Sequence, residues 1–261
     1  MKTSRAVVRR VSAAFGHAPG CCFPAWAFTL PGDVMANCRL FAGKLVSWQL
    51  VALLAFSASL SFAGVELDRM LSLAGQRYGD SGVASVTAWR ELLNQTANQP
   101  DAVKLRWVND FFNRRLRFGE DDAIWGKQDY WTTPLEVLGR AEGDCEDFAI
   151  AKYVTLKLLG IPSEKLRMTY VKARIGGPQS TIVQAHMVLS YYPAPGDEPL
   201  VLDSLISDIR PASRRSDLTM VFGFNTEGLW VGGVNPRAAS ASQRLSKWQS
   251  VIARMREEGI D

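Results

Sequence analysis

The chain of 261 residues carries a formal net charge of +4, with 30 Lys and Arg against 26 Asp and Glu. Six of these basic residues and one acidic residue lie in residues 1–63, so the 198 residues that follow contain 24 basic and 25 acidic side chains. This remainder is near neutral and long enough for one domain with a good core, and its charge gives no support to nucleic-acid binding.

The N-terminal segment has the features of a signal peptide. Arg39 and Lys44 precede an uncharged, largely apolar run over residues 45–62, and small residues occupy both positions that a signal peptidase reads. A positive start, an apolar run and small residues in this order are typical of a secreted protein. We therefore predict a signal peptide over residues 35–63 that is cleaved after Ala63.

The whole of residues 1–63 is accordingly assigned to a leader, and residues 64–261 to the functional domain. Residues 1–34 show no regular hydrophobic period, so Met35 is the candidate true start and the residues before it are an over-long extension. An uncleaved membrane anchor is the alternative, because about 18 apolar residues approach the length of a bilayer-spanning helix. Serines at positions 57, 59 and 61 weaken that alternative.

Hydrophobic periodicity predicts that helices come first in the functional domain. Apolar residues recur at spacings of three and four over residues 65–78 and 83–97. Pro100 opens a third predicted helix, since proline is well tolerated in a first helical turn. The segment 119–134 is rich in acidic and aromatic residues and is predicted to be a long ordered loop. Loops of that length are often functional.

Beyond Gly160 the pattern changes from helical spacing to alternation. The predicted strands are residues 166–173, 181–192 and 199–205, with 221–224 and 229–231 as candidates for short strands and 240–256 as a final helix. A loop rich in Pro and Gly, residues 193–198, joins the second and third strands as a hairpin. Helices followed by antiparallel strands indicate an α+β fold.

The candidate chemistry is centred on the stretch from Gly143 to Tyr153. Asp144 is the predicted N-cap of a helix over residues 145–159 with one apolar stripe, which places Cys145 in the first turn. Unpaired N–H groups and the helix dipole favour negative charge there, so we expect the thiol to lose its proton more easily. The alternative is a buried structural cysteine, the usual state of a free cysteine.

Beyond residue 63 the chain contains one cysteine, Cys145, and one histidine, His186. A single Cys and a single His in one domain are a candidate nucleophile and base. His186 and Asp203 fall in the second and third predicted strands, so the hairpin brings them opposite each other to within one register step. A carboxylate beside an imidazole fixes its orientation, as the third member of a triad does. A core histidine and an aspartate at a strand end are the alternatives.

A helix-start Cys followed by His and Asp on adjacent antiparallel strands resembles the transglutaminase-like, or papain-like, core of cysteine peptidases. The closer resemblance is to the bacterial transglutaminase-like cysteine proteinases of the LapG type. It is carried by motifs at residues 125–136, 143–153, 184–189 and 202–203 and covers most of residues 65–235. The resemblance implies N-terminal helices packed on an antiparallel sheet, and a catalytic triad of Cys145, His186 and Asp203.

The resemblance also implies a biological role. Proteinases of the LapG type are periplasmic endopeptidases that cut the N-terminal region of a large repeat-containing surface adhesin, which releases the adhesin and promotes biofilm dispersal. An inner-membrane cyclic-di-GMP receptor of the LapD type sequesters the proteinase. For this chain we therefore expect a periplasmic location, an adhesin as substrate and a LapD-like receptor as partner.

The family further requires calcium, bound by acidic residues beside the nucleophile. The resemblance therefore makes Asp144, Glu146 and Asp147 candidate ligands, together with an acid of the preceding loop. Asp129 is the loop residue that we select, with Asp121 and Asp122 as the alternatives. Their oxygens suit calcium, which takes about six to eight oxygen ligands. Without a cation, this many carboxylates would raise the pKa of the thiol of Cys145. The alternative is that these acids only cap the helix and favour its dipole.

Two other functions are compatible with the same residues. A transglutaminase or other acyl transferase would use the same Cys-His-Asp triad, because the active-site sequence does not distinguish water from an amine as the second substrate. An inactive binding module would keep the triad without reactivity of Cys145. Trp125 has two interpretations of its own, a contribution to the oxyanion site or simple packing.

Overall fold

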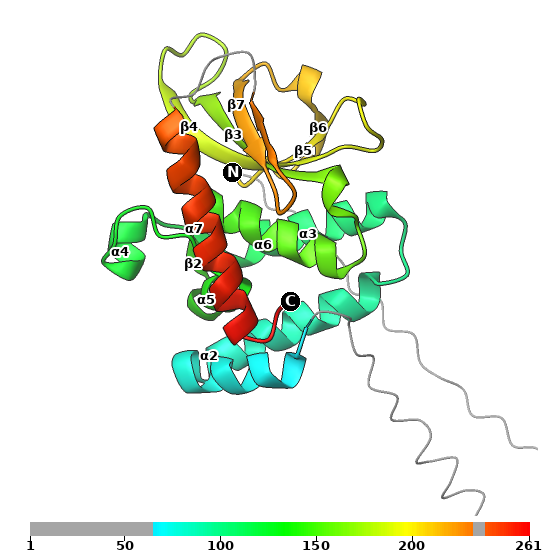
Figure 1. Cartoon of the computed structure of the whole chain (residues 1–261), viewed down its shortest axis with the longest axis vertical. Helices are drawn as coiled ribbons and strands as arrows, with labels where there is room; N and C mark the ends of the chain where they lie inside the picture. The colour runs from blue at the N-terminus through cyan, green and yellow to red at the C-terminus, as the bar shows by residue number, and fades with distance from the viewer. Residues whose placement is uncertain (1–64, 232–237) are drawn as a thin grey trace, which may run out of the picture. The chain divides into compact units, whose positions relative to one another are not determined.

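The fold combines an antiparallel sheet with helices packed against it (Figure 1). The structure, a computed structural model, describes residues 65–231 and 238–261, which belong to one compact unit. The predicted leader, residues 1–63, lies outside the described residues. The signal peptide, its cleavage site and the alternative membrane anchor therefore stay predictions.

Helices precede most of the strands, as the sequence predicted. The helices are α2 (Leu67–Thr96), α3 (Asp101–Arg115), α4 (Asp121–Trp125), α5 (Pro134–Arg140), α6 (Cys145–Leu158) and α7 (Ala238–Glu257). The strands are β1 (Arg117–Phe118), β2 (Glu142–Gly143), β3 (Leu166–Arg174), β4 (Val183–Tyr191), β5 (Leu200–Leu202), β6 (Arg210–Pro211), β7 (Leu218–Phe224) and β8 (Leu229–Val231).

The main sheet has the strand order β6-β5-β4-β3-β7-β8, and every neighbouring pair is antiparallel. β1 and β2 form a separate parallel pair. This arrangement confirms the predicted α+β fold. The prediction omitted β1, β2 and β6, because segments of two residues are too short to show a hydrophobic period.

α2 is one element with a break in its middle. Gly79 has φ 65° and ψ −157°, so the helix is interrupted between the two segments that were predicted as separate helices. Glycine adopts this backbone conformation because it has no Cβ. On the second half of α2, the indole of Trp89 donates to the hydroxyl of Thr155 at 2.9 Å, both buried. This contact fixes α2 to α6.

The segment between α3 and α6 contains two helices that were not predicted. α4 lies within residues 119–134, which were predicted to be a loop, and α5 begins at the last of these residues and continues into a stretch for which no element was predicted. α4 is a single short turn, and α5 begins with a capping box. The Thr133 hydroxyl accepts the N–H of Glu136 at 3.2 Å, and the Glu136 carboxylate accepts the N–H of Thr133 at 2.8 Å. A Thr-x-x-Glu box with Pro134 at the first helical position is a sequence signal for a helix, and the prediction overlooked it.

α6 is the central helix of the domain. Every residue from Glu146 to Leu156 is buried, because α6 packs against β4, β3, α3 and α5. The prediction of one apolar stripe was therefore wrong, since a helix covered on all sides buries its whole circumference. Gly160, with φ 84°, ends the helix, and the N–H of Ile161 donates back to the carbonyl of Leu156 at 3.0 Å.

α7 runs along the molecule from the sheet towards α2 and α5 (Figure 1). Trp248 packs edge-on against Tyr153 of α6 and Phe224 of β7, with ring centroids 5.6 and 6.4 Å apart. Further along α7, Arg254 Nη1 donates to the hydroxyl of Tyr130 at 2.6 Å. α7 therefore joins the sheet and the central helix to the loop that precedes α5.

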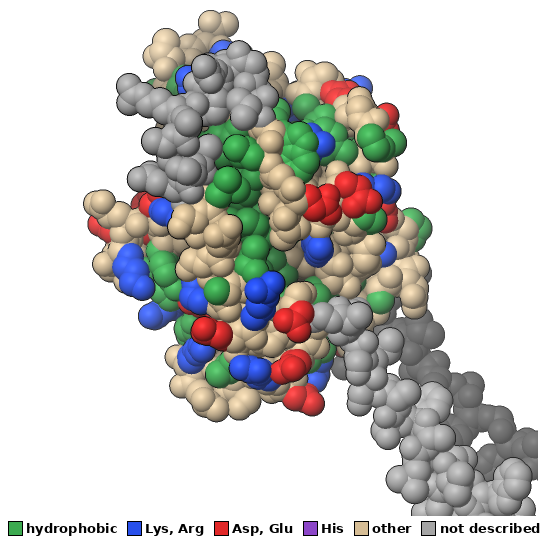
Figure 2. Space-filling view, viewed as in Figure 1, with side chains coloured by type: hydrophobic (Ala, Val, Ile, Leu, Met, Phe, Trp, Pro, Cys, Tyr) green, Lys and Arg blue, Asp and Glu red, His purple; other side chains and the backbone are tan. Residues whose placement is uncertain are grey.

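The face shown in Figure 2 carries basic and acidic side chains close to one another, with hydrophobic side chains visible along its centre. Mixed charge of this kind creates no strong field of one sign on the face that is seen. Across residues 65–231 and 238–261, every helix is either too short or too polar to cross a membrane.

A substitution at Gly139 tests how closely α5 packs on α2. A Cβ at this position would overlap the ring of Tyr78, whereas a Cβ on Gly75 would only touch Val83 at 3.4 Å. We expect Gly139→Ala to lower the free energy of unfolding by about 1–3 kcal/mol, the usual cost of overpacking. Gly75→Ala is the matched control and should raise it by roughly 0.5–1 kcal/mol, because alanine is the better helix former. Urea unfolding measures both, and equal effects would contradict the packing.

Candidate active site

Cys145 is the first residue of α6, where the sequence placed it. The carboxylate of Asp144 caps the helix and accepts the N–H groups of Glu146 at 3.0 Å and Asp147 at 3.3 Å. Asp147 completes the capping box by accepting the N–H of Asp144 at 3.3 Å. A Cβ on Gly143 would lie 2.7 Å from an oxygen of Asp147, so glycine is needed for this close turn.

The thiol of Cys145 does not have the environment that its helix position predicted. Its Sγ donates to a carboxylate oxygen of Glu146 at 2.7 Å. Burial raises the pKa of the thiol, and the charges of Glu146 and Asp144 raise it further. The N–H of Met187 acts in the opposite direction but is outweighed. The expectation of an easily lost proton was therefore wrong for the site without a cation, because neighbouring carboxylates oppose the helix start.

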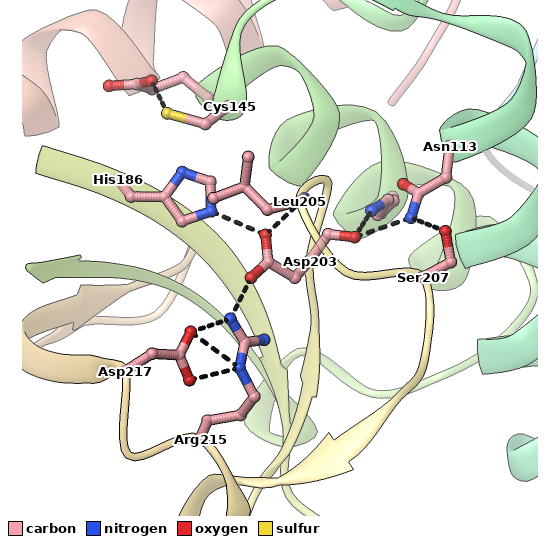
Figure 3. Close-up of polar contacts among 10 residues, drawn as sticks. Asn113, Cys145, His186, Asp203, Leu205, Ser207, Arg215 and Asp217 are labelled. Carbon is pink, nitrogen blue, oxygen red and sulfur yellow. Dashed lines mark hydrogen bonds and ion pairs between the residues drawn. The ribbon is translucent and has the colours of Figure 1, made fainter. Parts of the chain in front are cut away.

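The structure brings Cys145, His186 and Asp203 together. Nε2 of His186 lies 2.7 Å from Oδ1 of Asp203, and both side chains are buried. The other ring nitrogen of His186 faces Cys145 (Figure 3). Cys145 and His186 also line the same cavity of about 270 Å³. This order of thiol, imidazole and carboxylate can pass a proton from the thiol to the ring and hold the ring in place.

Asp203 lies after a strand and not within one, which corrects the predicted strand over residues 199–205. β5 ends at Leu202, whose partner on β4 is Leu189. Continuing that register would put Asp203 opposite Val188, two residues from His186. The prediction allowed an offset of one residue, so the predicted register was also wrong. The contact with His186 forms because the chain leaves the ladder and the carboxylate turns back to the ring.

The Asp203 carboxylate is fully enclosed and has a partner on each oxygen (Figure 3). Oδ1 also accepts the N–H of Leu205 at 3.0 Å, and Oδ2 accepts from Arg215 Nη2 at 2.6 Å. Burial alone would raise the pKa of Asp203, but hydrogen bonds from His186, Leu205 and Arg215 and the charge of His186 lower it to about 2. The carboxylate is therefore ionised at neutral pH.

Two side chains from the helices hold the carbonyl of Asp203. Nδ2 of Asn113 on α3 donates to it at 2.8 Å, and Nζ of Lys152 on α6 donates at 3.1 Å. Lys152 is buried, which lowers the pKa of its ammonium group to about 7 although the charge of Asp203 opposes the shift. The position of Asp203 thus depends on helices as well as on the sheet.

Arg215 was not among the residues predicted from the sequence. It lies 2 % exposed beyond a 3₁₀ turn and is held in turn by Asp217, whose carboxylate accepts from Nη2 at 2.8 Å and from Nε at 3.0 Å. Its segment has no hydrophobic period and no catalytic motif, so no sequence signal distinguishes it from a surface arginine.

Three carboxylates converge on the other side of the thiol. Oxygens of Asp121, Asp144 and Asp147 all lie within 4.8 Å of one another. Burial, together with the charges of neighbouring carboxylates, raises the pKa of Asp144 to about 9, of Asp147 to about 7 and of Asp121 to about 6. Oδ1 of Asp121 is buried without a hydrogen-bond partner among the described residues. A cluster of this kind suits a cation.

The two remaining predicted ligands lie at the same place but have other contacts. Asp129 and Glu146 line a cavity of about 440 Å³ with Asp121 and Asp144. The carboxylate of Asp129 accepts from Trp131 Nε1 at 3.1 Å and pairs with Lys247 at 2.6 Å. That of Glu146 contacts the thiol and accepts from the Tyr170 hydroxyl at 3.3 Å. Asp121, the alternative to Asp129 among the loop acids, joins the three-carboxylate group in their place.

Trp125 packs outside the cavity that holds the thiol. Its ring contacts Tyr130 at 5.3 Å between centroids and lies under the guanidinium of Arg140 at 5.2 Å. It is not among the residues that line the cavity of Cys145 and His186. The structure therefore favours the packing interpretation of Trp125.

Comparison with known proteins gives a consistent result. The model of the bacterial transglutaminase-like cysteine proteinase family matches residues 84–221. The solved structures of Legionella pneumophila LapG include one at 41% identity that covers 74% of this chain and 99% of its own, with a TM-score of 0.60. An EGTA-treated form is 40% identical, covers 74% of this chain and 100% of its own, and has a TM-score of 0.61. A calcium-bound form is 41% identical, covers 73% of this chain and 99% of its own, and has a TM-score of 0.61. No curated protein matches the chain.

The ion pair between Arg215 and Asp203 gives a test of this geometry. Arg215→Met should lower the free energy of unfolding by about 3–5 kcal/mol, because it leaves a buried carboxylate without its cation. Adding Asp203→Asn should recover part of that loss, since the charge that needs the cation is gone. Guanidinium unfolding at pH 7 measures both variants. A loss below about 1 kcal/mol in the single variant would contradict the pair.

Proposed function

The chain belongs to the bacterial transglutaminase-like cysteine proteinases, and from this premise we propose that it is a calcium-dependent cysteine endopeptidase with Cys145 as nucleophile. The observation that carries the proposal is that Cys145 and His186 line the same cavity, while Nε2 of His186 is hydrogen-bonded to Asp203. A lone thiol would not need a buried, oriented base beside it.

Each member of the triad has a defined task. Nδ1 of His186 accepts the thiol proton, and the ionised Asp203 stabilises the imidazolium that forms. Sγ of Cys145 then attacks the scissile carbonyl, His186 returns the proton to the departing amine, and water hydrolyses the acyl-enzyme. Asp144 already accepts the N–H groups of Glu146 and Asp147, so the N–H of Cys145 itself is the helix-start donor available to the oxyanion.

The residues of the acidic cluster fit a calcium ion. All donors are oxygens, three carboxylates lie within 4.8 Å, and one oxygen of Asp121 has no other described partner. We assign the centre of the site to Asp121, Asp144 and Asp147, because the carboxylates of Asp129 and Glu146 are engaged by Lys247 and Cys145. When bound, the ion supplies positive charge that offsets the carboxylates beside the thiol. The calcium-bound form of the Legionella protein supports calcium as the ion.

We extend the proposal to the biological setting that family membership suggests. The protein acts in the periplasm on the N-terminal region of a large repeat-containing adhesin, and cleavage releases the adhesin and promotes biofilm dispersal. A LapD-like cyclic-di-GMP receptor in the inner membrane holds the protease when the nucleotide is abundant. Export through the predicted signal peptide, residues 35–63, would bring the protein to both partners.

The triad is tested by cleavage of an adhesin N-terminal fragment in the presence of calcium. Cys145→Ala and His186→Ala should reduce the rate on the order of 10⁶-fold, whereas Asp203→Ala should cost about a hundredfold less, because removal of an orienting residue leaves part of the machinery. Gel electrophoresis and mass spectrometry follow the products. Cleavage by Cys145→Ala at the wild-type rate would contradict the proposal. Products joined by isopeptide bonds would show that the reaction is acyl transfer and not hydrolysis.

The calcium site is tested with a variant that separates charge from capping. Asp144→Asn keeps an N-cap, since asparagine caps helices as well as aspartate, but removes a carboxylate from the cluster. We expect it to weaken calcium binding at least tenfold in calorimetry and to lose activity, as the wild type should in EGTA. Magnesium should restore activity poorly, because it demands a tighter octahedral shell. Asp197→Asn, at an exposed position in the loop between β4 and β5, is the control. Full activity in EGTA with no calcium binding would contradict the site.

A further inference from the structure

One edge of β4 is open beside the thiol. β4 pairs with β3 along its whole length, Val183–Tyr191, but β5 covers only residues 189–191 on the other side. Within the described part of the chain, no strand pairs with residues 183–188 on that side. An open strand edge presents unpaired N–H and C=O groups and can accept another extended chain.

The register determines which main-chain groups face this edge. Ile175 N–H donates to the carbonyl of Ile182 at 3.0 Å, so Ile182 and every second residue after it bond towards β3. Alternate residues of an antiparallel strand direct their N–H and C=O groups to opposite sides. The groups that face the open edge therefore belong to Val183, Ala185 and Met187.

This row of main-chain groups starts at the nucleophile. The N–H of Met187 interacts with the thiol of Cys145. Ala185 lines the cavity of about 270 Å³ that also contains Cys145 and His186. Val183, the next outward-facing residue, is 55% exposed. The row therefore leads from the thiol out of the cavity to solvent.

We propose that the substrate peptide binds in extended form along this edge as an added strand. Its scissile carbonyl lies at Sγ of Cys145, and its main chain pairs with the outward N–H and C=O groups of Ala185 and Val183. The inference rests on the proposed function and narrows its substrates to segments that can become extended, because a helix has no free main-chain groups for such pairing. Main-chain pairing supplies affinity that does not depend on sequence.

Exposed apolar side chains border the same cavity and supply the sequence preference. Phe118 is 56% exposed and Leu205 is 51% exposed, and both line the cavity together with Ile175. Leu205 lies beside the ring of His186 (Figure 3). Exposed apolar groups gathered at a cleft are typical of binding surfaces. They favour apolar side chains close to the scissile bond.

The test uses Val183→Pro, which removes an outward N–H but no bond of the β3–β4 ladder. The probe is the chloromethyl ketone of acetyl-trialanine, which alkylates Cys145 when the thiolate displaces chloride and the thiol proton passes to His186. Iodoacetamide, too small to use the edge, reports the reactivity of the thiol alone. We expect Val183→Pro to slow the tripeptide reagent at least tenfold and to leave the iodoacetamide rate unchanged, in full-length protein with calcium. Mass spectrometry of the peptide that contains Cys145 follows both reactions, because residues 1–63 contain three further cysteines.

Val183→Ala is the matched variant, because it shortens the side chain and keeps the N–H, and it should slow the tripeptide reagent less than threefold. Equal tripeptide rates for Val183→Pro and wild type, or equal losses in both variants, would overturn the inference. If Val183→Pro changes the iodoacetamide rate, the wild type is compared with a tripeptide reagent methylated at its amide nitrogens, and an unchanged rate overturns the inference. A wild type that prefers the tripeptide reagent but cleaves no protein would remove the proposed function and leave the added strand standing.

Discussion

The buried carboxylate of Asp203 sets the conditions for the rest of the site. An ionised group without exposure to water is costly unless its oxygens have charged or hydrogen-bonding partners. Asp203 obtains them from His186 on β4 and from Arg215, and its carbonyl is held from α3 and α6. The orientation of the ring towards Cys145 therefore depends on how the helices pack against the sheet. Changes in the core should alter the reactivity of the thiol.

The carboxylates on the two sides of the thiol differ in how their negative charge is compensated. On the side of His186, the chain supplies its own cation, Arg215, and the carboxylate is ionised. On the side of the acidic cluster, burial and mutual repulsion raise the carboxylate pKa values, and these acids lie next to Cys145. The proposed calcium ion performs there the task that Arg215 performs at Asp203. Such a design makes the reactivity of one thiol depend on a dissociable ion.

Much of this could be predicted because the signals were local. Asp144 and Gly160 mark the ends of α6, and alternation marks the long strands, so the fold class and the position of Cys145 followed from sequence alone. The partners of Asp203 could not, since Arg215 reaches it through tertiary packing from a segment without a period. Membership of Asp121 in the cluster likewise depends on how the loop folds back on α6, which no spacing encodes.

The tautomer of His186 tests the central geometry most directly. It is the only histidine after residue 63, so residues 64–261 labelled with ¹⁵N-histidine give one pair of ring signals by NMR. In a Cys145→Ala variant, at a pH where the ring is neutral, we expect the proton to reside on Nε2, hydrogen-bonded to Asp203, with Nδ1 free to serve as the base. A neutral ring that carries its proton on Nδ1 would contradict it.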